Sequence, residues 1–348
     1  MERQQQQKAE LLQRTIKHID ITAHDTRALI AAYQEMSFSA RDLGRACDIY
    51  ERMLQDPDCI VILTVAGSTS AAGCMQVYVD MVRHNMVDVV VATGATIVDM
   101  DFFEALGFKH YRGSQFADDG MLREHYIDRI YDTYIDEDEL QQCDRAITEI
   151  ADALPPRPHS SREFIREMGR WLAANPARAL KPSSLVQTAF EHHVPIFCPA
   201  FTDSSAGFGL VAHQVAQPDA HLTIDSVRDF RELTELKIAA GDSGLLIIGG
   251  GSPKNFAQDT VVCAEILGKA VPMHKYSVQI TVADVRDGAC SSSTLKEASS
   301  WGKVDTVAEQ MVFAEATMAL PLLAAYGWHN GSWKKRRRRE LAKLLDGA

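Results

Sequence analysis

The sequence lacks the features that mark secreted, membrane-spanning or disulfide-bonded proteins. Its seven cysteines are odd in number and never spaced as C-x-x-C, which fits reduced thiols and argues against a disulfide framework or a zinc site. No stretch approaches the roughly 20 apolar residues that a membrane span requires. The opening residues MERQQQQKAELLQ hold no apolar segment typical of a signal peptide. We therefore expect a cytoplasmic protein with no membrane partner and no bound metal.

An excess of basic residues is also absent. The chain has 36 Lys and Arg against 47 Asp and Glu, a formal net charge of −11, which argues against a nucleic-acid partner because such proteins are usually basic. The exception is the run KKRRRRE (334–340). We interpret this run as a solvated helix end or flexible terminus. Contact with nucleic acid, a localisation signal, or contact with an acidic neighbouring subunit are the alternatives.

Short apolar runs alternate with amphipathic segments along most of the 348 residues. The expected strands are 59–65, 86–93, 194–202, 244–251 and 276–284. The expected helices are 26–55, 75–85, 97–107, 226–241 and 255–268. This alternation predicts an α/β protein with a Rossmann-like, mostly parallel sheet and helices on both faces. We expect an N-terminal helical extension (1–56), one large domain (57–330) and a basic C-terminal tail (331–348).

Three loops rich in small residues follow expected strands. They are AGSTSAAG (66–73), TGAT (93–96) and GGGSPK (249–254). In an open parallel sheet, ligands bind beyond the carboxyl ends of the strands, where glycines let a ligand approach the backbone. None of the loops matches G-x-G-x-x-G or the phosphate-binding loop, so any one of them alone could equally be a structural turn. Three such loops in one sheet favour a ligand site.

The segment SSSTLKEASSWGKVD (291–305) places Trp301 two residues before Lys303. Taken alone, these would be a core tryptophan and a surface lysine. However, the sequence resembles deoxyhypusine synthases and the related homospermidine synthases over nearly the whole chain. The matching segments are HNMVDVVVATGA (84–95), VPIFCPAFTDSSAG (194–207), LLIIGGGSPK (245–254), EASSWGKVD (297–305), VFAEATMALPLL (312–323) and, more loosely, SARDLGRACDIYERM (39–53).

The resemblance implies an NAD-dependent transferase. Family members oxidise the secondary amine of spermidine to an imine, carry the aminobutyl group as a Schiff base on a lysine, and pass it to an acceptor amine. Lys303 matches this lysine, which must be neutral to act as a nucleophile. Trp301 could wall its pocket and contact a substrate cation, and Glu297 could bind a substrate ammonium. The resemblance also implies a homo-oligomer, a tetramer with sites shared between subunits.

Positions expected to bind NAD carry over from the same resemblance. They are Ser68, Thr93, Gly94, Ala95, Asp203, Gly249, Gly250, Gly251, Ala283 and Glu315. Ser68 stands where an asparagine is typical, and Glu315 where the family usually has aspartate.

The departures from the family pattern concentrate around the substrate. Phe208 and Cys290 stand where the family has acidic residues, and Asn255 replaces a histidine that assists proton transfer, whereas Asp287 is retained. A protonated polyamine binds mainly through charge-assisted hydrogen bonds, so losing two carboxylates predicts a different amine substrate. We expect small-molecule amines as substrates, with a small diamine or guanidino-amine preferred over a protein lysine as acceptor. The alternatives are an NAD-dependent amine oxidoreductase and a non-enzymatic NAD- or polyamine-binding protein.

Overall fold

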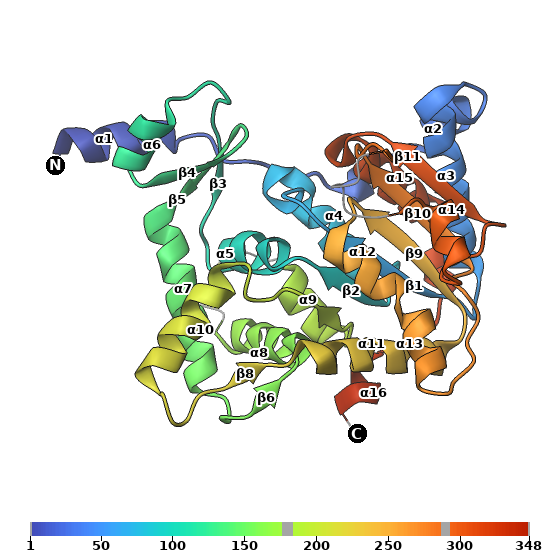
Figure 1. The fold of residues 1–348 in the computed structure, drawn as a ribbon. Coiled ribbons are helices and arrows are strands. Elements are labelled where there is room, and N and C mark those ends of the chain that lie inside the picture. Colours follow the sequence, from blue (N-terminus) through green and yellow to red (C-terminus); the bar gives the residue numbers. More distant parts are fainter. Residues whose placement is uncertain (1, 176–183, 287–292, 347–348) are drawn as a thin grey trace.

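A six-stranded parallel sheet forms the centre of the molecule (Figure 1). The computed structural model describes residues 2–175, 184–286 and 293–346. The strands are β1 (Ile60–Val65), β2 (Val89–Ala92), β7 (Ile196–Phe197), β9 (Ser243–Ile248), β10 (Tyr276–Thr281) and β11 (Glu309–Phe313). They lie in the order β11-β10-β9-β1-β2-β7, and each neighbouring pair is parallel. The predicted α/β fold with a mostly parallel sheet is confirmed.

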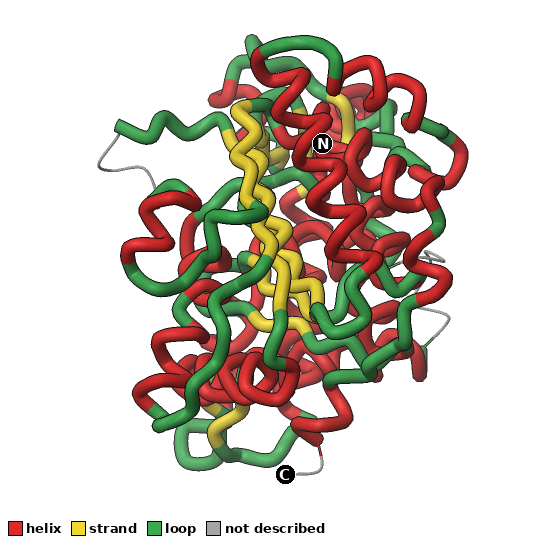
Figure 2. The backbone as a smooth tube through the Cα atoms, turned by 90° about the vertical axis from the view of Figure 1, so that its right-hand side faces the viewer, coloured by secondary structure: helices red, strands yellow, loops and turns green. Residues whose placement is uncertain are grey.

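Helices cover both faces of this sheet, and Figure 2 shows the strands as a layer between them. Alternate side chains of a strand point to opposite faces, so Val61 and Leu63 join one apolar cluster while Ile60 and Ile62 join another. Helices contributing to the first cluster are α3 (Phe38–Gln55), α4 (Met75–Arg83), α8 (Ser161–Ala174), α9 (Leu185–Glu191) and α15 (Ala316–Asn330). Those contributing to the second are α11 (Ser226–Ala240), α12 (Gly251–Gln258), α14 (Leu295–Ser300) and α16 (Ala342–Asp346). Burial on both faces explains why the strands are continuous apolar runs.

A smaller antiparallel sheet lies beside α7, at the side of the molecule where the chain begins (Figure 1). Its strands are β3 (His110–Arg112), β4 (Ile127–Ile130) and β5 (Thr133–Asp136), and the helices near it are α1 (Glu2–Leu11), α6 (Asp119–Glu124), α7 (Glu137–Asp152) and α10 (Ser205–Ala216). The sequence patterns did not predict this sheet, because its strands are short and partly polar. Within the described ranges, no helix is both long and apolar enough to cross a membrane.

The remaining elements are short. They are η1 (Ile21–Ala23), α2 (Arg27–Gln34), η2 (Ser70–Cys74), η3 (Ala95–Phe102), α5 (Phe103–Ala105), β6 (Pro158–His159), β8 (Thr223–Ile224), α13 (Thr260–Ile266) and η4 (Ser332–Lys335). The helical pattern expected over 26–55 is two helices, α2 and α3, because the chain turns at Phe38, where φ is +57°. The strand expected over 194–202 pairs only at β7, since Pro195 and Pro199 flank it and proline donates no ladder hydrogen bond.

The basic run 334–340 is docked on the domain, which corrects its interpretation as a solvated helix end or flexible terminus. The Arg336 guanidinium forms a 2.6 Å ion pair with Asp88, and both side chains are at most 5% exposed. Arg338 donates to the carbonyls of Val82 and Arg83 at the end of α4. Cations are favourable at a helix C-terminus, where backbone carbonyls lack partners. Two arginines of this run therefore have a structural role.

Candidate active site

The loops after β1, β2, β7 and β9 meet at one edge of the central sheet, because the carboxyl ends of its parallel strands share that edge. β2 and β7 continue from one side of β1, whereas β9, β10 and β11 continue from the other. The crevice at such a switch in strand order is where open α/β sheets bind ligands. We call the residues predicted there the glycine edge. It comprises Ser68, Thr93, Gly94, Ala95, Asp203, Gly249, Gly250 and Gly251.

Gly249 fits tightly between two strand ends. Its φ is +78°, and a side-chain carbon built on it would lie 3.2 Å from the carbonyl oxygen of Ala66. Gln279 of β10 fixes this loop, because its Nε2 donates to the Gly249 carbonyl over 2.8 Å while its Oε1 accepts from Lys254 Nζ over 2.9 Å. Gln279 was not among the predicted site residues, although its polar side chain inside the apolar run YSVQITV was a signal for it.

Thr93 and Gly94 join the loop after β2 to its neighbours on both sides. The Thr93 hydroxyl contacts the Thr96 hydroxyl at 3.0 Å, and Thr96 Oγ1 donates to the carbonyl of Gly67, next to Ser68. On the other side, a side-chain carbon added at Gly94 would lie 2.7 Å from the hydroxyl oxygen of Ser204, next to Asp203. The structure therefore brings the three predicted loops together with the turn at Asp203. The chain segments approach one another so closely that small residues are required between them.

Asp99 is a half-buried carboxyl behind this edge, and it was not among the predicted site residues. Burial, reinforced by the charges of Asp144 and Asp203, raises its pKa to about 6. Its Oδ1 accepts the backbone N–H of Ser205 over 2.7 Å, which ties η3 to the start of α10. Its place six residues after Thr93 was the available signal.

Ala283 and Glu315 follow the carboxyl ends of β10 and β11 at the same edge. The Ala283 N–H donates to Thr281 Oγ1 over 3.1 Å. Glu315 is exposed and caps α15, accepting the N–H of Met318 over 3.2 Å. Burial first, and the charge of Glu315 second, raise the pKa of the Cys74 thiol to about 12. Glu315 is thus close enough to influence the helical turn η2 that follows the loop after β1.

Lys303 lies in a second group of residues, which we call the lysine cluster: Asp259, Trp301 and Lys303. Lys303 Nζ forms an ion pair with the Asp259 carboxylate and lies 5.1 Å from the centre of the Trp301 ring. The Lys303 side chain is 16% exposed and Trp301 is 67% exposed. Trp301 is therefore not core filler, and Lys303 is not a freely solvated charge. Asp259 was missed, although it follows Asn255 by one helical turn.

The backbone around Lys303 is anchored to α14 and to the segment before β10. Its N–H donates to the Ala298 carbonyl over 3.0 Å, and its carbonyl accepts the N–H of His274 over 2.9 Å. Gly302 makes the turn possible, because its φ is +70° and non-glycine residues rarely adopt that region.

The two groups of residues are separated along α12. Gly250 and Gly251 begin this helix and Asp259 ends it, and eight helical residues span about 12 Å. Lys254 lies near the beginning, fully buried, where it donates to Gln279 and to the Ser293 carbonyl. Asn255 is half-buried and stands one turn before Asp259. Within one chain, the lysine cluster is therefore about a helix length from the glycine loop.

Glu297 caps α14. Its carboxylate accepts the N–H of Thr294 over 2.6 Å, while the Thr294 hydroxyl accepts the N–H of Glu297. The hydrogen bonds from Thr294 lower the pKa of Glu297, and the charge of Lys254 adds to the effect. Glu297 is exposed and anionic, but its Oε2 is already used by the cap.

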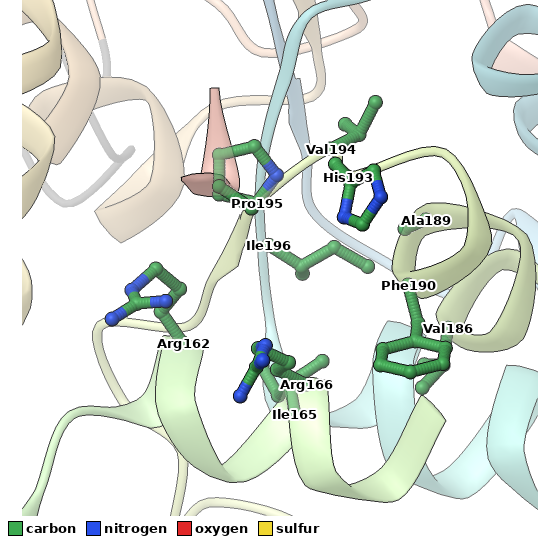
Figure 3. Close-up of a pocket in the computed structure, with 11 residues that line it drawn as sticks. Arg162, Ile165, Arg166, Val186, Ala189, Phe190, His193, Val194, Pro195 and Ile196 are labelled. Carbon is green, nitrogen blue, oxygen red and sulfur yellow. The ribbon is translucent and has the colours of Figure 1, made fainter. Parts of the chain in front are cut away.

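Phe208 lies away from the lysine cluster. It is 69% exposed on α10 and lines an open hollow with α6, β4 and α7, on the opposite side of the molecule from α14 (Figure 1). Asp287 and Cys290 are outside the described residues. A separate cavity between α8, α9 and β7 contains none of the predicted site residues (Figure 3). Its walls include Ile165, Val186 and Ile196 beside two arginines, whose positive charge does not suit a polyamine.

The sequence pattern of the deoxyhypusine synthase family matches residues 28–327. The chain belongs to this family. A deoxyhypusine synthase-like protein from Coxiella burnetii is 68% identical over 338 residues, which cover 97% of this chain and 96% of the relative. A Methanosarcina mazei protein named probable deoxyhypusine synthase 2 is 38% identical over 307 residues, covering 88% and 87%. The resemblance inferred from the sequence is confirmed.

The fold of the deoxyhypusine synthase family is also found in a solved structure. The crystal structure of a "putative deoxyhypusine synthase from Entamoeba histolytica" superposes with a TM-score of 0.60 at 19% identity, covering 90% of this chain and 97% of that one. For this member of the deoxyhypusine synthase family, the described ranges contain no group of three or more His, Cys, Asp or Glu suited to a metal ion. They do contain loops rich in small residues at the sheet edge and an ion-paired lysine.

Proposed function

We propose that this protein is an NAD-dependent transferase that moves an alkylamine group, of the aminobutyl type, from a polyamine to an acceptor amine through an imine on Lys303. The observation that carries the proposal is the environment of Lys303. Its ammonium is partly withdrawn from solvent against the Trp301 ring, in the segment EASSWGK that the family resemblance rests on. A lysine that served only as a surface charge would not require partial burial against an aromatic ring.

The glycine edge is suited to a dinucleotide. Gly94 and Gly249 lie so close to neighbouring backbone or side-chain atoms that a Cβ would encroach on the cradle, and the N-terminus of α12 opens toward it. NAD, when bound, supplies a hydride acceptor for the carbon beside the secondary amine and later a hydride donor for the product imine. The chain's contribution is to hold that carbon near Lys303.

Lys303 then exchanges one imine for another. Its neutral amine adds to the imine carbon of the oxidised donor, and the donor's other half leaves as a free amine, so that R–CH=N–R′ and the lysine give R–CH=N–Lys303 and R′–NH2. The acceptor amine reverses this exchange with its own nitrogen. Asn255 does not titrate near neutral pH and cannot transfer protons as a histidine would. The protons that the imine exchange takes up and releases therefore pass to and from solvent or another group.

Substrate selection is proposed to differ from that of spermidine-specific relatives, with a small diamine or guanidino-amine as acceptor. Phe208 is an apolar residue where an anion would hold a polyamine nitrogen. It belongs to an exposed apolar stripe on α10 with Val211 and Val215, which are 61% and 77% exposed. Such a stripe fits a subunit contact. We propose a homo-oligomer, a tetramer by resemblance, in which this face of one copy completes the site of another.

The test is to trap the imine. The protein is incubated with NAD and each member of a panel of diamines, triamines and guanidino-amines, then reduced with borohydride and digested. Mass spectrometry is expected to find the alkylamine mass on the Lys303 peptide, with release of the complementary amine. A panel-wide absence of adduct contradicts the proposal. Accumulation of NADH without an adduct supports an amine oxidoreductase instead, an alternative favoured by the loss of the histidine at Asn255. Binding of NAD or a polyamine without either product supports a non-enzymatic binding protein.

A further inference from the structure

We propose that Asp259 binds a primary ammonium group of the substrate, and that the arriving substrate displaces Lys303 from this carboxylate. The inference rests on the proposed function and names the substrate class more closely: an amine that carries a terminal ammonium besides the nitrogen that reacts.

The contact between Lys303 and Asp259 is itself the first argument. A lysine side chain is a primary ammonium on a four-carbon chain, so its Nζ stands in for the end of an aminobutyl group. The structure shows that the Asp259 carboxylate accepts such a cation. At 39% exposure, the Asp259 side chain is also more open to solvent than the 16% exposed lysine. A ligand from solvent can therefore reach the carboxylate.

The second argument is that neighbouring charged groups have other partners. Glu297 accepts the Thr294 N–H with one carboxylate oxygen, and Lys254 donates to Gln279 and Ser293. His274, whose backbone pairs with Lys303, is fully buried, and burial lowers its pKa to about 3, so it adds no positive charge. Asp259 is the carboxylate in direct contact with Lys303, and it faces no other charged side chain through a described ion pair.

The charge balance of the chain also favours Asp259 as a ligand for an ammonium group. Two anionic positions of the family pattern are occupied here by Phe208 and Cys290, whereas α12 carries a carboxylate at its end. A charge-assisted hydrogen bond to Asp259 supplies the kind of contact that those positions lack. The Trp301 ring, already 5.1 Å from a cation, offers a second contact to the same ammonium.

Displacement would also prepare the nucleophile. A substrate ammonium bound at Asp259 takes the carboxylate partner of Lys303 and frees the lysine side chain from the ion pair. The Lys303 side chain can then turn toward the imine carbon. The carboxylate keeps one cation partner throughout this exchange.

The binding test needs no turnover. Calorimetry would measure spermidine binding to the NAD-loaded protein, with N-propylbutylamine as the matched probe that lacks both primary amines. Lys303→Ala removes the competing cation, so spermidine is expected to bind about tenfold more tightly than to wild type, a change of the size one charge-assisted contact supplies. Adding Asp259→Asn is expected to reverse this gain. The monoamine is expected to bind all forms with similar, weak affinity.

Matched variants separate the possible outcomes. Asp305→Asn removes a carboxylate two residues from Lys303 that caps the Val307 N–H and is expected to leave spermidine affinity unchanged. Asp259→Glu is expected to restore most of what Asp259→Asn loses. Equal spermidine affinity with and without the Asp259 carboxylate in the Lys303→Ala background overturns the inference. So does equal affinity of that protein for spermidine and N-propylbutylamine, a readout that needs no Asp259 variant.

Trapping then relates the inference to the proposed function. If wild type forms the Lys303 adduct, Asp259→Asn is expected to need about tenfold more spermidine for the same adduct rate. Adduct formation that is faster in Asp259→Asn at every spermidine concentration means the carboxylate only restrains the lysine, and the inference fails while the transferase proposal stands. If wild type forms no adduct but the binding pattern holds, the transferase proposal fails while the ammonium site stands.

Discussion

The glycine edge and the lysine cluster are built by different means. The glycine edge is made of backbone and small side chains at the ends of buried strands, and its shape depends on the absence of Cβ atoms at Gly94 and Gly249. The lysine cluster is made of long side chains at the ends of two helices, held by an ion pair between Lys303 and Asp259. Steric exclusion controls the first region and charge controls the second. Substitutions should therefore affect the two regions in separable ways.

Lys303→Arg is the variant expected to separate the properties of the two regions most clearly. Arginine keeps the positive charge and can pair with Asp259, but its guanidinium does not lose its proton in proteins and forms no imine with the donor. We expect complete loss of the borohydride-trapped adduct. The free energy of unfolding should change by less than about 0.5 kcal/mol, because the ion pair is retained and partly exposed. Denaturant titration and NAD binding measured in parallel would check that the glycine edge is unaffected.

A detectable adduct in Lys303→Arg, on any peptide, would mean that another nucleophile carries the group. Lys254 is the control for this outcome. It is fully buried and bonded to Gln279, so its peptide is expected to remain unmodified in both proteins.

Two glycine substitutions test the contrast in the other direction. At Gly94 the backbone conformation suits any residue, but an added Cβ would lie 2.7 Å from Ser204 Oγ and 3.1 Å from the Phe201 carbonyl oxygen. At Gly302 the added Cβ meets nothing within 4 Å, but φ is +70°. Gly94→Ala is expected to cost roughly 1–3 kcal/mol of unfolding free energy by overpacking. Gly302→Ala is expected to cost about 1–2 kcal/mol through backbone strain.

The functional readouts of these two variants should diverge. Gly94→Ala is expected to weaken NAD binding by at least about tenfold, because relieving the clash moves the loop that lines the cradle. Gly302→Ala is expected to leave the Kd for NAD unchanged and to slow trapping at Lys303, which it repositions. Fluorescence titration with NAD and the adduct assay measure the two effects. If Gly94→Ala and Gly302→Ala weakened NAD binding to the same extent, the two regions would not be independent.

The same contrast explains what the sequence could and could not reveal. The strands and the small-residue loops of the glycine edge were predictable, because burial on both faces requires apolar runs and close backbone approach requires glycine. Both signals are local in the sequence. The family resemblance supplied Lys303 and Trp301 through one compact segment, EASSWGK.

Contacts between distant segments were not predictable. Asp259 and Lys303 are 44 positions apart and meet because α12 and the turn after α14 end close together, which no periodicity encodes. For the same reason the arginine run at 334–340 was misinterpreted: its partner Asp88 lies in the segment before β2, far away in the sequence. The antiparallel sheet β3-β5-β4 was missed since its short, half-polar strands resemble loops.

The smallest expected effect concerns Asp99, which would show whether the glycine edge also depends on charge. Its pKa is raised to about 6 by burial and by Asp144 and Asp203, whereas in the unfolded chain it keeps its ordinary value of 3.8. Between these two values the folded protein binds more protons than the unfolded chain, so stability from this group falls as pH rises from about 4 to about 6. Below that window the contribution is fully retained, and above it the penalty for an ionised buried carboxyl is constant.

Asp99→Asn removes this slope. The unfolding free energy of wild type minus that of the variant is expected to fall by roughly 1–2 kcal/mol between pH 4 and pH 6.5, less than the full pKa shift implies because the side chain is partly exposed. Urea titrations across this range measure the difference, with Asp132→Asn in the exposed turn before β5 as a surface control for the loss of a carboxylate. A flat profile for Asp99→Asn would mean that the Ser205 N–H, which donates to Asp99 over 2.7 Å, compensates for burial. The stability of the glycine edge would then depend on packing and not on the titration of Asp99, which would sharpen the contrast with the lysine cluster.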